Sequence, residues 1–334
     1  MTQPAPLLAI ENLAVTFRTE AGNVTPVRGV DLAVFAGRTT ALVGESGSGK
    51  SVTALAVMGL LPRASGGISG GSVRYRLKSG ETSDLAKLPP EGMRRLRGSE
   101  IAMIFQEPMT SLNPVLSVGE QIAEQVRHHT GTGSAAAMRR AVEMLGLVEI
   151  PDAARRAADY PHQMSGGMRQ RVMIALAMSC NPRLLIADEP TTALDVTIQA
   201  QILALVDRLR REHDMGVLFI THNLGVVAEI ADDVTVMYAG EAVEAAEVRT
   251  MFRDPRHPYT RALIDCLPAR ARTGADGRRV VSSIPGSVGG AAAAGGCKFA
   301  PRCSHAAPPC HAAHPILEPS DGGHMIRCFR WRDL

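Results

Sequence analysis

The feature that most constrains this chain is the eight-residue run Gly-Glu-Ser-Gly-Ser-Gly-Lys-Ser, from Gly44 to Ser51. It follows an apolar stretch at 39–43 that predicts a strand, and it opens a predicted helix over 51–60. Glycines in such a turn let successive backbone N–H groups converge on one anion, and the helix N-terminus adds partial positive charge. The run fits the pattern G-x-x-x-x-G-K-[ST], which predicts a phosphate-binding loop rather than a glycine-rich turn without a ligand.

All eight residues of this run are expected to form the binding site for a nucleoside triphosphate. Lys50 would neutralise the β- and γ-phosphates, and the Ser51 hydroxyl would ligate Mg²⁺. The complete set is Gly44, Glu45, Ser46, Gly47, Ser48, Gly49, Lys50 and Ser51.

A second apolar run, LLIAD at 184–188, ends in the two carboxylates Asp188 and Glu189. Asp188 is expected to hold Mg²⁺ through water, and Glu189 to orient and deprotonate the attacking water. A solvated strand end is the alternative, because Asp-Glu pairs are common. The phosphate-binding loop elsewhere in the chain favours the hydrolytic interpretation.

Strand-like and helix-like stretches alternate along the chain. The runs 101–105, 184–188 and 217–221 are short, apolar and rich in branched residues, which is typical of buried parallel strands. Helical spacing covers 116–128, 135–147, 165–180 and 196–212, while 234–244 predicts two strands joined by a turn at Ala239–Gly240. This alternation predicts an α/β architecture with a parallel sheet.

Length and composition limit the class of protein. With roughly 150 residues per domain, 334 residues predict about two domains. A net charge of +3 is too small to indicate a dedicated nucleic-acid binder. No apolar run approaches the roughly 18–20 residues that span a bilayer, and the first residues do not resemble a secretory signal. We therefore expect a soluble, cytoplasmic protein.

A third motif distinguishes between classes of phosphate-loop protein. Residues 163–171 read QMSGGMRQR, which resembles the signature sequence, usually LSGGQ, of ATP-binding-cassette (ABC) ATPases. Other landmarks of that family follow in order: Phe17 as the adenine-stacking aromatic, Gln106 as the Q-loop glutamine, 193–195 as the D-loop, and His222 as the switch histidine. The resemblance covers nearly all of 7–255. It implies a cassette with a RecA-like parallel-sheet core, an antiparallel β subdomain and a helical subdomain at about 107–180.

The resemblance also implies roles for these residues. Gln106 would contact Mg²⁺ and the hydrolytic site, and His222 the γ-phosphate. The signature residues Ser165, Gly166 and Gly167 would complete the ATP site of an opposing cassette, because they form a helix N-terminus. Met168 stands where the family usually has Gln, and Asn223 where Asp is frequent. Neither departure is expected to matter much.

Four further strings resemble the ATPase subunits of the oligopeptide, dipeptide and nickel importers. They are QEPMTSLNPVLSVGEQ at 106–121, YPHQMSGGMRQR at 160–171, HPYTRALIDCLP at 257–268 and CKFAPRC at 297–303. The resemblance implies an ATP hydrolase on the cytoplasmic face of the membrane, working with a second related ATPase, two permeases and an extracytoplasmic binding protein. It leaves peptide, nickel or another small solute open as the cargo, with peptide the commoner. The surface around Gln106 and 107–120 would receive a permease helix.

Three rival functions remain at this stage. A soluble ABC protein of DNA repair or translation usually carries two cassettes or a long coiled-coil insert. A phosphate-loop kinase or GTPase lacks Ser-Gly-Gly after a helical insert. A binding module with a dead ATP site is disfavoured by Glu189 and His222.

Composition changes near residue 255, and we expect a small appended domain over 256–334 after a cassette at 1–255. Residues 286–296 (GSVGGAAAAGG) predict a flexible link within that domain. Four of the six cysteines fall in this part: Cys297, Cys303, Cys310 and Cys328. In a reducing compartment such clustering indicates a metal site before disulfides.

The cysteine spacing, with five, six and seventeen residues between neighbours, fits neither a zinc ribbon nor a standard ferredoxin run. Two alternatives remain from the residues alone. One is a zinc site, for which the nearby histidines at 305, 311, 314 and 324 could replace cysteine ligands, and the other is a set of buried thiols without a metal. Three cations at 298, 302 and 327 adjoin the cysteines and would offset negative charge. Within the peptide importers this pattern resembles one that holds a four-iron four-sulfur cluster, which we favour, in a structural role.

Overall fold

The computed structural model describes residues 5–62, 64–106, 111–192, 194–273, 279–280, 282–288 and 295–334. Ala193 of the predicted D-loop, 107–110 of the predicted permease-facing segment and 289–294 of the predicted link lie outside these residues. The chain forms two compact units, each built from several stretches. The first unit takes the chain up to Leu8, Val34–Arg38 and Arg74–Phe219, and the second takes Ala9–Ala33, Thr39–Val73 and Ile220–Leu334. The domain division at residue 255 stays a prediction.

The first unit contains the three predicted apolar strands as β6 (Ile101–Ile104), β7 (Leu184–Asp188) and β8 (Gly216–Thr221), whose last two residues enter the second unit. They lie in the order β8-β7-β6, and β6 pairs with β7 in parallel, in register from Ile101–Leu184 to Ile104–Ala187. Every residue of β7 is buried, which explains why the strand is a continuous apolar run rather than an alternating one.

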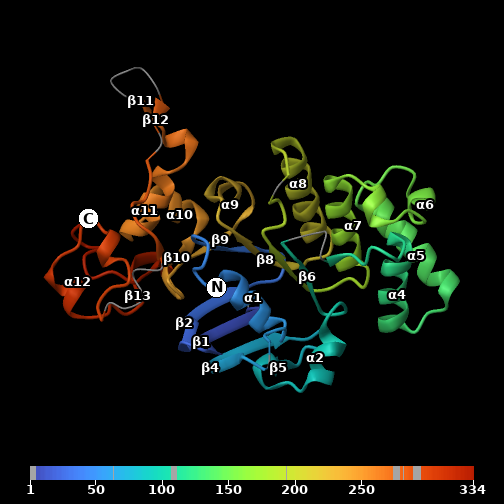
Figure 1. The fold of residues 1–334 in the computed structure, drawn as a ribbon, viewed down its shortest axis with the longest axis horizontal. Coiled ribbons are helices and arrows are strands. Elements are labelled where there is room, and N and C mark those ends of the chain that lie inside the picture. Colours follow the sequence, from blue (N-terminus) through green and yellow to red (C-terminus); the bar gives the residue numbers. More distant parts are fainter. Residues whose placement is uncertain are drawn as a thin grey trace. The chain divides into compact units, whose positions relative to one another are not determined.

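The helices of the first unit begin close to where the spacing predicts them. They are α4 (Val118–Thr130), α5 (Ser134–Leu147), α7 (Gly166–Met178) and α8 (Val196–Glu212), with the short α2 (Pro90–Leu96) and α6 (Ala153–Arg156). Side-chain oxygens of Ser117, Ser165 and Asp195 accept a backbone N–H at the starts of α4, α7 and α8. Helices α4, α5 and α7 pack against one another (Figure 1).

The second unit holds strands in the order β13-β14-β10-β9-β3. Their bounds are β3 Thr39–Val43, β9 Asp233–Tyr238, β10 Glu241–Glu247, β13 Glu318–Pro319 and β14 Met325–Ile326. Strand β3 pairs with β9 in parallel, and β9 and β10 form an antiparallel hairpin. Its turn residues Ala239 and Gly240 both have positive φ, 48° and 88°, which confirms the turn predicted there.

A second sheet carries β2 (Gly22–Val34), β1 (Leu8–Thr19) and β4 (Gly66–Arg76) in that order. Strand β4 ends in the first unit, where it pairs with β5 (Thr82–Asp84) antiparallel. The remaining helices of the second unit are α1 (Lys50–Val57), α9 (Leu224–Ile230), α10 (Val248–Arg253), α11 (Pro258–Asp265) and α12 (Pro308–Ala312). Two-residue strands β11 (Arg272–Thr273) and β12 (Arg279–Val280) pair antiparallel.

The C-terminal segment is part of the second unit's sheet. Strand β14 pairs antiparallel with β10, placing Ile326 opposite Glu244 and Met325 opposite Ala245. The Glu244 carboxylate is fully buried and accepts hydrogen bonds from the backbone N–H of Arg256 (2.7 Å) and His257 (3.0 Å), and it lies 2.7 Å from His324 Nε2. These bonds offset the cost of burying a charged group and hold the start of α11 in place.

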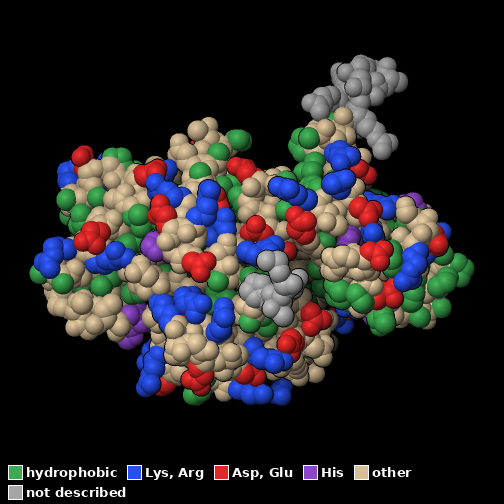
Figure 2. Space-filling model, turned by 180° about the vertical axis from the view of Figure 1, so that it is seen from behind, with side chains coloured by type: hydrophobic (Ala, Val, Ile, Leu, Met, Phe, Trp, Pro, Cys, Tyr) green, Lys and Arg blue, Asp and Glu red, His purple; other side chains and the backbone are tan. Residues whose placement is uncertain are grey.

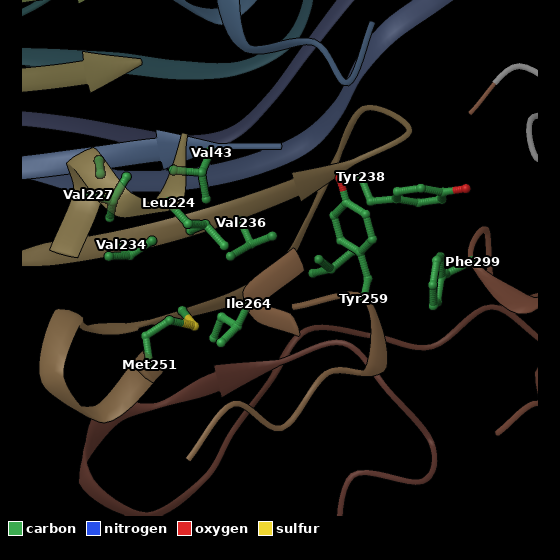
Figure 3. Close-up of a cluster of buried hydrophobic side chains, with 12 residues drawn as sticks. Val43, Leu224, Val227, Val234, Val236, Tyr238, Met251, Tyr259, Ile264 and Phe299 are labelled. Carbon is green, nitrogen blue, oxygen red and sulfur yellow. The ribbon is translucent and has the colours of Figure 1, made fainter. Parts of the chain in front are cut away.

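An apolar cluster links these elements (Figure 3). Val43 from β3, Val234 and Val236 from β9, and Met251 from α10 are buried in it. At one end the rings of Tyr238, Tyr259 and Phe299 pack together, with centroids 4.7 to 5.3 Å apart. Burial of this kind supplies most of the stabilising free energy of a fold.

Basic and acidic side chains are interspersed on the face shown in Figure 2, which suits a net charge of only +3. In the part of the chain that the structure describes, no helix has the length and apolar character needed to cross a membrane.

Replacing Phe299, which is 3% exposed, with Ala should lower the free energy of unfolding by about 3–5 kcal/mol, because it leaves a cavity against the rings of Tyr238 and Tyr259. The matched change Ile316→Ala, at a side chain 73% exposed, should cost no more than about 0.5 kcal/mol. Guanidinium denaturation followed by circular dichroism measures both. Equal costs at the two positions would show that Phe299 does not anchor the cluster.

Candidate functional site

The phosphate loop connects β3 to α1 in the second unit, as the sequence predicts. Two of its glycines cannot be replaced without moving backbone. Gly44 has φ 155°, and a Cβ there would lie 2.2 Å from the Met237 carbonyl oxygen. Gly49, with φ 102°, would place a Cβ 2.4 Å from the carbonyl oxygen of Pro26. The loop therefore lies directly against the backbone of neighbouring strands, which only glycine allows.

Lys50 lies over this loop and is only 5% exposed. Its ammonium donates hydrogen bonds to the carbonyl oxygens of Gly44 (2.8 Å) and Glu45 (2.9 Å), with Ser48 Oγ at 3.4 Å. Ser51 follows Lys50 in the first turn of α1. The loop thus gathers a cation, a hydroxyl and a helix N-terminus around one place, the set of groups that binds phosphate.

Glu45 has partners that the sequence did not reveal. Its backbone N–H donates to the Tyr259 hydroxyl at 3.0 Å, and its carboxylate accepts two hydrogen bonds from Arg302, at 2.6 and 2.9 Å. From sequence, Arg302 is only one of the cations beside the cysteines, and Tyr259 only part of the string HPYT. A separation of 257 residues leaves no periodic or spacing signal for such a pair.

The first unit brings Gln106 and Glu189 together. Glu189 Oε2 accepts a hydrogen bond from Gln106 Nε2 (3.2 Å) and one from Thr192 Oγ1 (2.9 Å). Asp188, the preceding residue, ends the buried strand β7 and is 5% exposed. Glu189 has φ 47°, a conformation that residues with a side chain adopt rarely, and its carboxylate is held in one orientation by two donors.

The signature residues lie at the N-terminus of α7, in the first unit. Ser165 accepts a hydrogen bond from the backbone N–H of Met168 at 3.3 Å, so it caps the helix. A hollow here is lined by Ser165, Gly166, Gly167, Met168, Arg171, Leu194, Asp195 and Ile198. Asp195 caps α8 on the same hollow by accepting from the Ile198 N–H at 2.9 Å. Two helix N-termini therefore open on one hollow.

His222 and Phe17 both belong to the second unit. His222 follows β8 and is exposed, and the next residue, Asn223, caps α9 by accepting the Gly225 N–H at 2.9 Å. The cap explains why Asn serves in place of Asp, since both accept such a bond. Phe17 lies on β1 with its ring directly against Gly66, where a Cβ would come within 2.1 Å of the ring.

The four clustered cysteines line one cavity in the second unit, together with His257, Phe299 and His305 among others. Burial, and to a smaller extent the neighbouring thiols, raises the pKa of the Cys297, Cys303 and Cys328 thiols, to about 11 for Cys328. Among the described residues, no group of three or more His, Cys, Asp or Glu side chains is placed to hold a metal ion.

Comparisons with known proteins agree with this geometry. Residues 27–192 match the family described as ABC transporter, and residues 243–310 match the one described as oligopeptide/dipeptide transporter, C-terminal region. A protein of Brucella abortus (strain 2308), named for peptide import and ATP binding, is 56% identical over 332 residues, 98% of each chain. The glutathione import ATP-binding protein GsiA of Escherichia coli O1:K1 / APEC is 56% identical over 262 residues, which are 78% of this chain and 42% of GsiA.

Among solved structures, the dimeric ATP-binding cassette MJ0796, in a post-hydrolysis state with ADP and Pi, covers 72% of this chain and 99% of its own, with 25% identity and a TM-score of 0.63. CbiO1 of Clostridium perfringens, part of the transporter complex cbiONQ, has a TM-score of 0.62, with 24% identity over 75% of this chain and 92% of its own, and shares the fold. These likenesses confirm the ABC cassette fold predicted from the motifs. The chain belongs to the ABC transporter family, among the ATP-binding subunits of the oligopeptide and dipeptide importer group.

Proposed function

We propose that this chain hydrolyses ATP to drive the import of di- or oligopeptides through a pair of membrane permeases. The observation that carries the proposal is the phosphate loop with Lys50 bonded over it, in a chain that matches a peptide-import relative from end to end. Nickel or another small solute is the second candidate cargo, and a soluble, non-transport ABC ATPase the third. The C-terminal match to the oligopeptide/dipeptide region favours the peptide importer over both.

The phosphate loop, from Gly44 to Ser51, is proposed to hold the nucleotide. Its backbone N–H groups and Lys50 would take the phosphates, while Phe17 would stack on the adenine. Ser51, Gln106 and Asp188 would hold Mg²⁺. Their hydroxyl, amide and carboxylate oxygens are hard donors of the kind that this ion prefers, so the residue types fit. When bound, the ion would offset negative charge on the phosphates.

Glu189 is proposed as the base for hydrolysis. The bonds from Gln106 and Thr192 hold its carboxylate in one orientation, which suits a group that must take a proton from a water in line with the γ-phosphate. His222, exposed after β8, would contact the γ-phosphate. A contact of this kind stabilises the negative charge that develops there during transfer.

Replacing Glu189 with Gln should lower the rate of ATP hydrolysis about 10²-fold or more while leaving ATP affinity nearly unchanged, because the amide cannot take a proton. Lys50→Ala should instead weaken ATP binding itself. Glu212→Gln, at an exposed position on α8, is the matched control and should change neither. Unaltered turnover of Glu189→Gln in the assembled transporter would remove its assigned role.

A second ATPase is proposed to complete the site. Ser165, Gly166 and Gly167 form a helix N-terminus that opens on a hollow, a favourable place for the γ-phosphate of a nucleotide bound to another subunit. A related cassette is described as dimeric in its ADP and Pi state. The resemblance to the importer group implies a second, related ATPase, so we propose a related chain as the partner, with a second copy of this chain as the alternative.

The remaining partners would be two permeases and an extracytoplasmic binding protein, with this chain peripheral on the cytoplasmic face of the membrane. Phe105 and Val115, on either side of 107–110, are 38% and 75% exposed, and Tyr160 is 40% exposed. Exposed apolar side chains that gather in one patch favour an interaction surface, and this is the arrangement that the proposal requires of these three. They support the prediction that the segment after Gln106 receives a permease helix.

The isolated chain should hydrolyse ATP slowly, because its own signature residues serve another subunit. Adding the related ATPase and the permeases should raise the rate at least about tenfold, since groups supplied in trans raise phosphoryl transfer by more than this in other nucleotidases. Turnover is measured beside light scattering. A monomer as fast as the complex would contradict the proposal.

We also propose that Cys297, Cys303, Cys310 and Cys328 hold a four-iron four-sulfur cluster. The four thiols line one cavity and are close enough to influence one another's pKa. A single zinc ion would need sulfurs about 3.8 Å apart, from Zn–S bonds of about 2.3 Å, whereas a cluster needs wider spacing because iron and sulfide lie between the thiolates. The shared cavity is the observation that supports a group bound by all four thiols. When bound, the cluster would cross-link the segment that carries the four cysteines.

Anaerobically purified protein should be brown, and Cys297→Ser should remove most of the visible absorbance and the bound iron. Cys266→Ser, at a half-buried cysteine outside the cavity, is the matched control and should leave both unchanged. Colourless protein that contains one equivalent of zinc would show that the cysteines form a zinc site and not a cluster.

A further inference from the structure

One arginine joins the phosphate loop to the cysteine-bearing segment. Arg302 immediately precedes Cys303, and its two terminal nitrogens donate to the two carboxylate oxygens of Glu45, at 2.6 and 2.9 Å. The Arg302 side chain is 5% exposed and that of Glu45 30% exposed. Two parallel bonds between a guanidinium and a carboxylate fix orientation as well as distance.

The arginine is itself held in one place. Its Nε donates to the Pro285 carbonyl oxygen at 2.7 Å, and its guanidinium carbon lies 5.7 Å from the centre of the Tyr238 ring. Its backbone belongs to a short turn between two cysteines, in which Ala300 N–H donates to the Cys297 oxygen (3.1 Å) and Cys303 N–H to the Ala300 oxygen (3.2 Å). The position of Arg302 therefore depends on the order of residues 297–303.

At the other end of the pair, Glu45 is built into the loop. Its carbonyl oxygen accepts from Lys50 at 2.9 Å and from the Ser48 N–H at 3.2 Å, and its own N–H is occupied by the Tyr259 hydroxyl. Holding the Glu45 side chain therefore restrains the backbone that shapes the loop. A loop already ordered before its ligand arrives loses less conformational entropy on binding.

We infer that Arg302 is a positioning residue for nucleotide binding, which makes ATP affinity depend on the order of the segment from Cys297 to Cys303. Arg302 acts through Glu45, the residue of the loop to whose carboxylate it donates two hydrogen bonds. The inference rests on the proposed function, because it requires the phosphate loop to bind ATP. The coupling is reciprocal, so bound ATP also stabilises the segment.

The test measures the dissociation constant for ATP by calorimetry, on the full chain at low temperature, for the variants Arg302→Met, Arg302→Lys and Glu45→Gln. Arg302→Met should weaken ATP binding about tenfold, within the 5- to 150-fold range typical of coupled sites. Arg302→Lys should have a smaller effect, because it keeps the charge and loses the two-pronged geometry. Combining Arg302→Met with Glu45→Gln should add little to either single change.

Arg330→Met is the matched control. Arg330 lies two residues after Cys328, and its side chain bonds to Asp333 and to the His305 carbonyl oxygen, not to the loop. It should leave ATP affinity unchanged. Cys303→Ser alone should weaken ATP binding. In a chain that already carries Arg302→Met, it should weaken ATP binding no further. In the assembled transporter, Arg302→Met should raise the KM for ATP and leave kcat nearly unchanged.

Three outcomes would overturn the inference. The first is an ATP affinity equal to that of the wild type in both Arg302→Lys and Glu45→Gln. The second is an equal loss of ATP affinity in Arg302→Met and Arg330→Met, and the third is that the losses of affinity in Arg302→Met and Cys303→Ser are additive. Circular dichroism shows whether each variant is folded, and the two milder substitutions decide the matter if Arg302→Met is not. If the wild-type chain binds no ATP, or Lys50→Ala binds it as tightly, it is the proposed function that fails.

Discussion

The shape of the phosphate loop depends on two hydrogen bonds that the Lys50 ammonium donates to the carbonyl oxygens of Gly44 and Glu45. Lys50 is only 5% exposed, so its ammonium loses most of its hydration, and the two carbonyl bonds offset that loss. Gly44 can point its carbonyl this way because its φ of 155° suits glycine and because its missing Cβ leaves room for the Met237 carbonyl. The loop and strand β9 therefore define each other's position.

The surroundings of the loop give it a fixed shape through a chain of polar contacts. The buried Glu244 carboxylate holds the backbone N–H of His257, and His257 Nδ1 accepts the Tyr259 N–H at 3.1 Å. Burial lowers the pKa of His257 to about 4, which keeps the ring neutral and able to accept. The Tyr259 hydroxyl then accepts the Glu45 N–H. A buried carboxylate on β10 is thus connected to the phosphate loop in three steps.

The sequence predicted those features that depend on residues close to one another in the chain. The phosphate loop, the carboxylates after β7 and the Ser165 cap each depend on neighbours within eight residues, and the apolar period located the strands and helices around them. The string HPYT, by contrast, resembles the importer family, but the sequence alone gives no physical reason for these residues. The structure supplies one, because His257 caps α11, Pro258 opens it and Tyr259 reaches the loop. The Arg302–Glu45 pair lay beyond prediction, since nothing in spacing or periodicity relates residues 257 positions apart.

Stability and geometry come from different interactions in this unit. The valines of β9 and the rings of Tyr238, Tyr259 and Phe299 bury apolar surface, which gives a large but non-directional gain. The Arg302–Glu45 pair gives little net free energy, because desolvating two charges offsets much of their attraction. What such a pair contributes is orientation, since a fork of two hydrogen bonds tolerates little rotation. The apolar cluster can thus keep the second unit folded, while this polar pair adds to the Lys50 and Tyr259 bonds that orient Glu45 in the phosphate loop.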